Sequence, residues 1–401
     1  MLSLGIARTS SALLSLNRIF DHLPLNMLDE DKLKSLFLHL LRAAIWEDKV
    51  DTSLFPLSES EWQWIYVTAV RQTMESVLLD AVLSLPEDCQ PSSALQKAWT
   101  TAAVAQERAY LEQLRTLNYI YARFLSSGIT PVVVKGVSLS VCYPRPNHRY
   151  ASDIDLFYGT ITQKDEADKT IEGWGIPVER KLQDESICMV GQVVVENHGR
   201  LFLDHNPLVG PSTRKRLDDA LSSPNAYCRK DVSGSEITTL NPTLTLLLLV
   251  CHSYRHVITS GIGLRQLTDI ALFLNKEHSN IQWDTYISWA KDWKMMVWTR
   301  CLLTTLRKYL GLSPALSPLD AGSEKDADVL MNEVWLSANF GQTDTRYVGQ
   351  EAEKNSKRTT LRRLLHYYRL FAHHSYGEAT GSLMKLIHQR LKEKLSGKSI
   401  E

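Results

Sequence analysis

Apolar residues in the N-terminal part of the chain recur every three or four positions, which is the spacing of one face of an α-helix. The spacing is clearest at Leu33, Leu36, Phe37, Leu40 and Leu41. It continues through residues 62–82 and 111–125, and Gly128 stands where the end of a helix favours positive φ. The pattern therefore predicts an N-terminal helical region over residues 1–127.

The pattern changes after residue 128 to short runs typical of β-strands. Residues 131–134 form a β-branched run, as expected of a buried strand. Residues 152–158 alternate acidic and apolar side chains, which predicts a strand with two distinct faces. A polar helix is expected from Gln163 to Gly173. Further strands are predicted around residues 178–182, 187–190 and 193–197, which completes a small α/β core over residues 128–212.

Helical spacing returns after about residue 215 and continues through a C-terminal region, residues 213–401. Pro242–Tyr254 is strongly apolar, and Leu264–Leu274 is typical of another core helix. From Lys354 onward the sequence is basic, which indicates a helix with solvated charges or, as a minor alternative, one that binds nucleic acid. The fold class expected is α+β and predominantly helical, with a small mixed sheet between N- and C-terminal helical regions.

Composition and charge add little about partners. Lysine plus arginine and aspartate plus glutamate both number 45, so the net charge names no partner. The six cysteines form no Cys-x-x-Cys pair, which suits a reducing cytoplasm. No apolar run is long enough to span a bilayer, and residues 1–20 lack the continuous apolar stretch of a signal segment. We expect a cytoplasmic protein that begins with an ordinary helix.

The segment Ser152-Asp153-Ile154-Asp155-Leu156 carries the clearest chemical signal. Side chains two apart on a strand point the same way, so Asp153 and Asp155 share a face while Ile154 and Leu156 enter the core. Two adjacent carboxylates repel each other unless a cation lies between them. Oxygen ligands suit Mg²⁺, with Mn²⁺ as the alternative. Taken alone, this short pattern is more often a solvated strand edge.

The turn that precedes this strand is typical of a phosphate site. A strand ends at Lys135-Gly136, and the residues from Val137 to Val141 indicate the start of a helix, where backbone N–H groups bind phosphate. Lys135 and Ser138 would add a charge and a hydroxyl donor. Arg149 would add a guanidinium fork for triphosphate oxygens. The alternative is an ordinary strand-to-helix turn with solvated basic side chains.

A third acid is needed on a neighbouring strand, to bind metal or to accept the proton of an acceptor hydroxyl. Glu196 is the best candidate, because an acid within a β-branched run faces either solvent or a site. His198 lies two residues further along and hence on the same side. Surface exposure is the alternative for both residues.

The chain resembles the nucleotidyltransferase superfamily of the DNA-polymerase-beta type, and more narrowly its branch of uncharacterised nucleotidyltransferases. The likeness spans about residues 100 to 310. The motifs that carry it, in order, are Val132-Val133-Val134-Lys135-Gly136, Cys142-Tyr143-Pro144, Arg149, Ser152 to Leu156, Glu196 to Leu201, Leu247 to His256 and Gly263 to Asp269. The superfamily usually has Gly-Ser or Gly-Gly at the turn, where this chain has Lys135-Gly136-Val137.

This resemblance implies transfer of a nucleoside monophosphate from an NTP to an acceptor hydroxyl, with release of pyrophosphate. Asp153, Asp155 and Glu196 would be the catalytic and metal-binding acids. Lys135, Gly136, Ser138 and Arg149 would hold the triphosphate. The acceptor stays open among a protein, a nucleic acid, a sugar and a small molecule, and the oligomeric state is likewise open.

Two other functions fit parts of the sequence. The altered turn favours a degenerate nucleotide- or RNA-binding protein without turnover. His252 and His256 stand four apart on a predicted helix, and with Asp269 they suit a metal-dependent phosphohydrolase. The plainer interpretation makes these histidines residues at the edge of the core or at the border of the nucleotide pocket. Arg265 is a further candidate residue, although Arg265 and Asp269 also have the spacing of an intrahelical ion pair.

Overall fold

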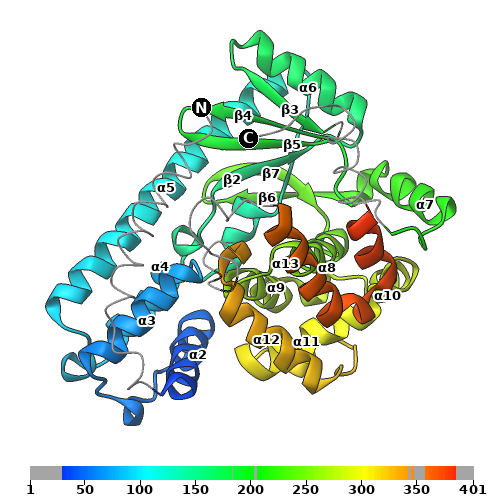
Figure 1. Cartoon of the computed structure of the whole chain (residues 1–401). Helices are drawn as coiled ribbons and strands as arrows, with labels where there is room; N and C mark the ends of the chain where they lie inside the picture. Colours follow the sequence, from blue (N-terminus) through cyan, green and yellow to red (C-terminus); the bar gives the residue numbers. More distant parts are fainter. Residues whose placement is uncertain are drawn as a thin grey trace. The chain divides into compact units, whose positions relative to one another are not determined.

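A computed structural model describes most of the chain (Figure 1). The helix expected at residues 1–20 lies outside the described residues, as do residues 354–356 and the part of the basic tail beyond residue 384. The described residues are 29–182, 184–202, 206–341, 344, 346 and 357–384.

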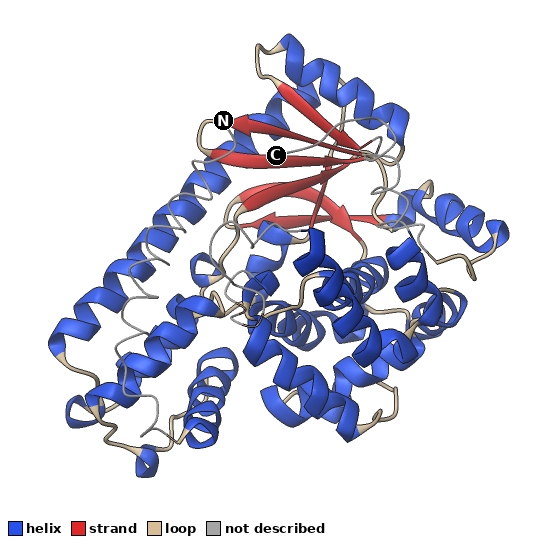
Figure 2. Cartoon of the chain, in the orientation of Figure 1, coloured by secondary structure: helices blue, strands red, loops and turns tan. Residues whose placement is uncertain are grey.

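The protein has an α+β fold in which helices predominate, as the sequence predicted, and Figure 2 shows its helices in blue and its strands in red. Contacts divide the chain into two compact units. The first comprises the described chain up to Arg200 together with Tyr227–Asn241. The second comprises Leu201–Ala226 and the described chain from Pro242 onward. The N-terminal helices and the sheet thus belong to one unit.

Most helices of the first unit begin where a polar side chain caps them. Ser58 and Glu61 form a reciprocal capping box at the start of α3, and the Ser92 hydroxyl accepts a hydrogen bond from the first turn of α5. These caps satisfy N–H groups that have no partner within the helix. Within the described part of residues 1–127, the predicted helices are present. The helices are α2 (Glu30–Trp46), α3 (Glu59–Arg71), α4 (Glu75–Ser84), α5 (Ser93–Ser126) and α6 (Ile161–Gly173).

Glu75, at the start of α4, makes the stability of this unit depend on pH. Its Oε2 atom is shielded from solvent and has no hydrogen-bond partner among the described residues. Burial raises the pKa of Glu75 from 4.5 to about 7. The folded protein therefore keeps this proton at pH values where the unfolded chain releases it. The contribution of the protonated Glu75 side chain to folding stability is full below the pKa of Glu75 in the unfolded chain. It is lost as pH rises through the pKa of Glu75 in the folded protein.

We therefore expect Glu75→Gln to flatten the pH dependence of unfolding. Between about pH 5 and pH 8 the wild-type protein should lose about 2 kcal/mol of stability through this group, and the variant should not. Urea unfolding followed by circular dichroism at several pH values measures the difference. Glu87→Gln, at an exposed glutamate in the neighbouring turn, is the control. The same pH slope in the wild type and in Glu75→Gln would contradict the assignment.

The strands of the described chain form one seven-stranded mixed sheet. β2 is the central strand of the sheet. It pairs with β1 in the antiparallel direction on one side and with β5 in the parallel direction on the other. The five predicted strands are confirmed, with shifts of one or two residues at their ends. The sheet has the order β3-β4-β5-β2-β1-β7-β6, with strands β1 (Val132–Val134), β2 (Asp153–Phe157), β3 (Val178–Leu182), β4 (Glu185–Val190), β5 (Val193–His198), β6 (Tyr227–Val232) and β7 (Ser235–Leu240).

The β6–β7 hairpin shows that the prediction of helix throughout the region after residue 215 was wrong in part. Ser233 and Gly234 both have positive φ, 51° and 85°, which is the backbone of a tight hairpin turn. The Asp231 carboxylate accepts a hydrogen bond from the Gly234 N–H group. β7 then pairs with β1, with Thr238 opposite Val132. The Ser-Gly dipeptide was the local signal for this turn.

One face of the sheet forms the core of the first unit. Ile154 and Leu156 of β2 and Val193 and Val195 of β5 point to this face and are almost completely buried. Because side chains alternate along a strand, the acids between them point to the opposite face. The apolar partners of the sheet on α5 and α6 are Leu114, Leu117, Ile120, Phe124, Ala167 and Ile171.

The second unit is helical in its described part. The predicted helices at 242–254 and 264–274 are confirmed as α8 and α9, and most of their side chains are buried. Its helices are α7 (Pro211–Leu221), α8 (Pro242–Thr259), α9 (Leu264–Glu277), α10 (Trp283–Asp292), α11 (Met296–Leu310), α12 (Glu324–Ser337) and α13 (Lys357–Phe371), followed by the 3-10 helix η10 (Ala372–His374).

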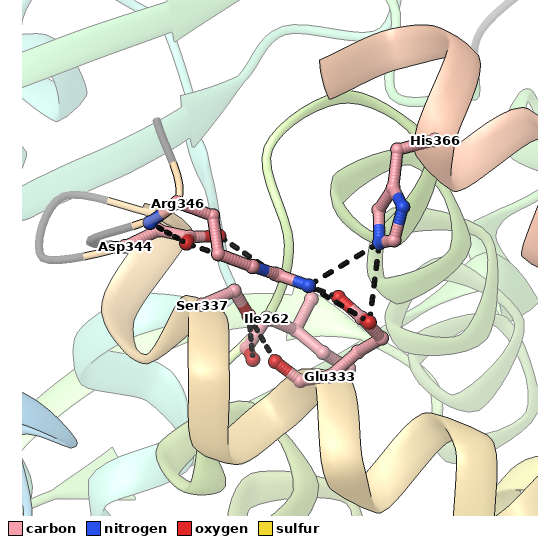
Figure 3. A network of polar contacts seen from close by, with 6 residues as sticks. All are labelled: Ile262, Glu333, Ser337, Asp344, Arg346 and His366. Carbon is pink, nitrogen blue, oxygen red and sulfur yellow. Dashed lines mark hydrogen bonds and ion pairs between the residues drawn. The ribbon is translucent and has the colours of Figure 1, made fainter. Parts of the chain in front are cut away.

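Arg346 joins parts of the second unit through buried carboxylates. Its guanidinium group binds Asp344 with contacts of 2.8 and 3.0 Å, and Glu333 of α12 also with contacts of 2.8 and 3.0 Å. Figure 3 shows His366 of α13 beside the same Glu333 carboxylate, at 3.2 Å. Although burial disfavours its charge, the hydrogen bonds to Asp344 and Glu333 raise the pKa of Arg346. The network therefore joins Asp344, α12 and α13 around one guanidinium group.

In the described part of the chain, no helix has both the length and the apolar character needed to cross a bilayer. The longest apolar run, Leu244–Cys251, lies within α8, where all but its last residue are buried. All six cysteines lie in the described part and are free thiols.

Candidate metal centre

The register of the sheet brings predicted acids from two strands side by side. β2 and β5 run parallel, and Asp155 lies opposite Glu196. Alternate residues of a strand face the same way, so Asp153 shares the face of Asp155, and His198 shares the face of Glu196. The opposite face of the sheet is the one that packs against α5 and α6.

Asp155, Glu196 and His198 form a group of potential metal ligands. One ligand atom from each residue lies within 4.8 Å of the others. His198 Nε2 lies 2.9 Å from Asp155 Oδ1 and 3.8 Å from Glu196 Oε2. The Asp155 side chain is 7% exposed, whereas that of Glu196 is 25% exposed, so the group is open to solvent on the Glu196 side.

Asp155 contacts Lys135 and His198. Lys135 Nζ lies 3.0 Å from Asp155 Oδ1, the oxygen that also contacts His198. Burial alone would raise the pKa of Asp155, but Lys135 and His198 outweigh it and hold the pKa well below its ordinary value. The same contact raises the pKa of Lys135, although burial opposes its charge. Asp155 is therefore an anion and Lys135 a cation in this structure.

The pKa of Glu196 reflects the repulsion among the carboxylates of this face. Burial, followed by the charges of Asp155 and Asp153, raises the pKa of Glu196 to about 7. A divalent cation at this position would remove the cause of that shift, because it favours the ionised carboxylate. Two carboxylates and an imidazole accommodate Mn²⁺, and the carboxylates together with water suit Mg²⁺. The donor set thus fits the cation that the sequence indicated.

Asp153 lies beside this group but is not part of it. Among the described residues, only the other three place ligand atoms so close together at this face. The charge of Asp153 nevertheless acts on the cluster, because it contributes to the raised pKa of both Lys135 and Glu196. Asp153 is half-buried, whereas Asp155 is buried. It is therefore the more accessible of the two aspartates.

The turn after β1 approaches the acids closely. Lys135 and Gly136 both have positive φ, 53° and 43°. A Cβ atom on Gly136 would lie 3.4 Å from the Asp153 carbonyl oxygen and 3.7 Å from Asp155 Oδ2. The positive φ of Gly136 accounts for the glycine in physical terms, because other residues rarely adopt this backbone conformation.

The helix predicted after this turn is a 3-10 helix and not an α-helix. Residues Gly136–Cys142 form a 3-10 helix, η4, of seven residues. The backbone N–H and the hydroxyl of Ser138 both donate to the Lys135 carbonyl, at 2.9 and 2.7 Å. Ser138 is buried and stabilises the turn in this structure. The helix expected after the turn is thus present as a 3-10 helix, and the Ser138 hydroxyl adds a hydrogen bond to its first turn.

Polar residues of α5 position the segment that leads into β2. Gln106 Nε2 donates to the Arg149 carbonyl at 3.1 Å, and Gln113 Nε2 donates to the Ala151 carbonyl at 2.9 Å. Arg149 is itself buried, and its Nη1 donates to the Tyr150 carbonyl at 3.1 Å. Sequence analysis missed the two glutamines. Their spacing of seven residues within an apolar helix face was the available signal.

The histidines of α8 contact each other. His252 Nε2 and His256 Nε2 lie 2.9 Å apart. Asp269 is buried in α9, and within the described chain these three residues are not among the groups that gather potential metal ligands. Arg265 Nη2 lies 3.4 Å from the Asn339 side-chain oxygen. The geometry of the described residues therefore gives no support to a phosphohydrolase centre built on this trio.

Comparison with protein families gives one informative result. A family model described as "Uncharacterised nucleotidyltransferase" matches residues 58–311. Comparison with curated proteins and with solved structures gives no significant match. The matched stretch contains every described strand of the sheet and every residue of the candidate site.

Proposed function

The chain belongs to this family of uncharacterised nucleotidyltransferases, and from that premise we propose that it transfers a nucleoside monophosphate from an NTP to an acceptor hydroxyl. The acceptor oxygen forms a bond to the α-phosphorus, the bond between the α-phosphorus and its bridging oxygen breaks, and pyrophosphate leaves. The observation that supports this proposal most strongly is the group of Asp155, Glu196 and His198, beside Asp153, on one face of the sheet.

Each residue of the site has a role in this proposal. Asp153, Asp155 and Glu196 hold Mg²⁺ or Mn²⁺. When bound, the cation neutralises phosphate charge and polarises the α-phosphate. Glu196 also accepts the proton of the acceptor hydroxyl, because its carboxylate is more exposed to solvent than that of Asp155. His198 positions the Asp155 carboxylate through their hydrogen bond.

The turn and the segment before β2 form the triphosphate site in this proposal. Lys135 supplies the charge, and Gly136 allows the backbone to approach the phosphates. Ser138 supports this turn through the Lys135 carbonyl. Arg149 is the second cationic residue for the triphosphate. In this structure Lys135 pairs with Asp155. In the proposed complex, the cation would bind Asp155 and the lysine would contact the triphosphate instead.

Lys135→Met is expected to weaken NTP binding by roughly tenfold to a hundredfold, because a charge-assisted hydrogen bond contributes about 1.5–3 kcal/mol. Isothermal titration calorimetry with ATP and with GTP in the presence of Mg²⁺ measures the change. Lys135→Arg should recover much of the affinity, since it keeps the charge. Lys97→Met, at an exposed lysine of α5, is the matched control. Equal affinity of Lys135→Met and the wild type would remove Lys135 from the site.

The proposed transfer itself is tested by an acceptor screen. The full chain is incubated with each α-³²P-labelled NTP, Mg²⁺ and a cell extract, and label is followed in the protein, nucleic-acid, sugar and small-molecule fractions. We expect label in one fraction together with release of pyrophosphate. The Asp153→Asn protein, treated in parallel, separates this reaction from those of the extract. Labelling that is equal with the wild type and the variant would reject the proposal.

A nucleotide-binding protein without turnover is the second candidate function. The ion pair of Lys135 with Asp155 favours it, because a protein cation already neutralises one proposed metal ligand. This function predicts NTP binding in calorimetry with no labelled product in any fraction of the acceptor screen.

A further inference from the structure

A second group of potential metal ligands lies in the second unit, where no part of the proposed function places one. It consists of Asp326 in the first turn of α12 and of His373 and His374 in η10. One ligand atom from each residue lies within 4.8 Å of the others. The group depends on none of the nucleotidyltransferase residues.

The distances within this group match those between ligands of one metal ion. His373 Nε2 lies 3.4 Å from Asp326 Oδ2, and His374 Nε2 lies 3.6 Å from the same oxygen. With metal–ligand bonds of about 2.0–2.2 Å, two ligands of a tetrahedral zinc ion lie roughly 3.3–3.6 Å apart. The contacts are too long for good hydrogen bonds but suit a shared cation.

His374 provides an independent indication of a ligand. Its side chain is 1% exposed, and its Nε2 atom has no hydrogen-bond partner among the described residues. A buried polar atom without a partner costs about 1–3 kcal/mol. An ordinary ion pair between Asp326 and His373 leaves this cost in place. A cation bound by all three residues removes it.

The backbone presents both histidines to the same side. Adjacent residues of an α-helix do not face each other, but α13 ends at Phe371 and the chain continues as a 3-10 turn. The two imidazole rings there lie 3.9 Å apart. The Tyr254 hydroxyl fixes this turn, because it lies 3.0 and 3.1 Å from the carbonyl oxygens of Phe371 and Ser375.

Solvent can reach the group from one side only. The His373 side chain is 42% exposed and that of Asp326 is 26% exposed, whereas His374 is enclosed. An ion can therefore enter past His373 and keep a water molecule as its fourth ligand. Two imidazoles, one carboxylate and one water form a usual ligand set for zinc.

We propose that Asp326, His373 and His374 bind one Zn²⁺ ion, which fastens the start of α12 to the end of α13. The ion stabilises the packing of the C-terminal helices of the second unit. It takes no part in the nucleotidyl transfer proposed above, so either proposal can fail without the other.

Zinc titration of the full chain tests this site. The protein is freed of metal with a chelator, dialysed and titrated with Zn²⁺ alone in a calorimeter. His373→Ala is the main variant, because His373 is the most exposed ligand and its loss is expected to disturb the fold least. Asp326→Asn is the second. Each should lose one equivalent of zinc or bind it at least about tenfold more weakly. His278→Ala, at a histidine outside the group, should keep every equivalent.

Two further measurements make the test specific. Zinc should raise the unfolding temperature of the wild type more than that of His373→Ala. Co²⁺ in place of zinc should give the visible bands of a four-coordinate site without absorption from a thiolate. The charge of Asp326 acts on the Cys301 thiol, which is not part of the proposed ligand set. A sulfur-to-cobalt band would overturn that ligand set, as would equal zinc binding by the wild type and His373→Ala.

Discussion

Replacing Asp153 with asparagine is expected to lower Mg²⁺-dependent release of pyrophosphate from NTP by at least about 10³-fold, or roughly 4 kcal/mol in the barrier. The substitution keeps the size of the side chain but removes the charge that acts on Lys135 and Glu196. Asp153 is also the aspartate whose loss disturbs the fold least, because it is only half-buried. A coupled pyrophosphatase assay with the acceptor found in the screen measures the rate.

The design of this test depends on the difference between the two aspartates. Asp155→Asn should abolish the same activity, but it also leaves Lys135 without its buried partner, so its loss of activity is informative only if the variant remains folded. Asp88→Asn, the same change at an exposed turn, should keep full activity. If Asp153→Asn released pyrophosphate at the wild-type rate and remained folded, the carboxylate site would not be the catalytic centre.

Arg346→Met is expected to destabilise the second unit by about 3 kcal/mol or more, because removing one partner of a buried ion pair leaves the others uncompensated. The side chains of Glu333 and Asp344 are only 8% and 1% exposed, and both lose their guanidinium partner (Figure 3). Methionine fills much of the arginine volume, so the loss reports charge and hydrogen bonds rather than a cavity. Urea unfolding followed by circular dichroism measures the change.

Two controls identify the cause of this loss. Arg346→Lys keeps the charge but cannot form the two-pronged contacts, so its stability should lie between those of the wild type and Arg346→Met. Arg369→Met removes an exposed arginine of α13 and should leave the unfolding midpoint unchanged. An unfolding midpoint of Arg346→Met equal to that of the wild type would mean that the network adds nothing to stability.

The sequence was most informative where local pattern and tertiary environment agree. The alternation from Asp153 to Leu156 predicted which side chains enter the apolar core, because successive side chains of a strand point to opposite faces of the sheet. Ile154 and Leu156 are accordingly fully buried. The helices α2 to α5 were likewise predictable, since their apolar spacing and their polar caps act over a few residues only.

Predictions were wrong where contacts distant in sequence decide the outcome. The β6–β7 hairpin reads locally as a polar segment, and it becomes part of the sheet through the pairing of Thr238 with Val132. Short polar strands lack a strong period of their own, so the partner strand supplies much of their stability.

By itself, the sequence determined the α+β class, the acids that share one face of β2 and the third acid on a later strand. Only the tertiary structure decided that Glu196 lies opposite Asp155, that Lys135 forms an ion pair with Asp155, and that His198 joins them. Strand periodicity fixes the direction of a side chain, but the register between strands depends on residues far apart along the chain. The charges that set the pKa of Glu196 therefore meet only after folding.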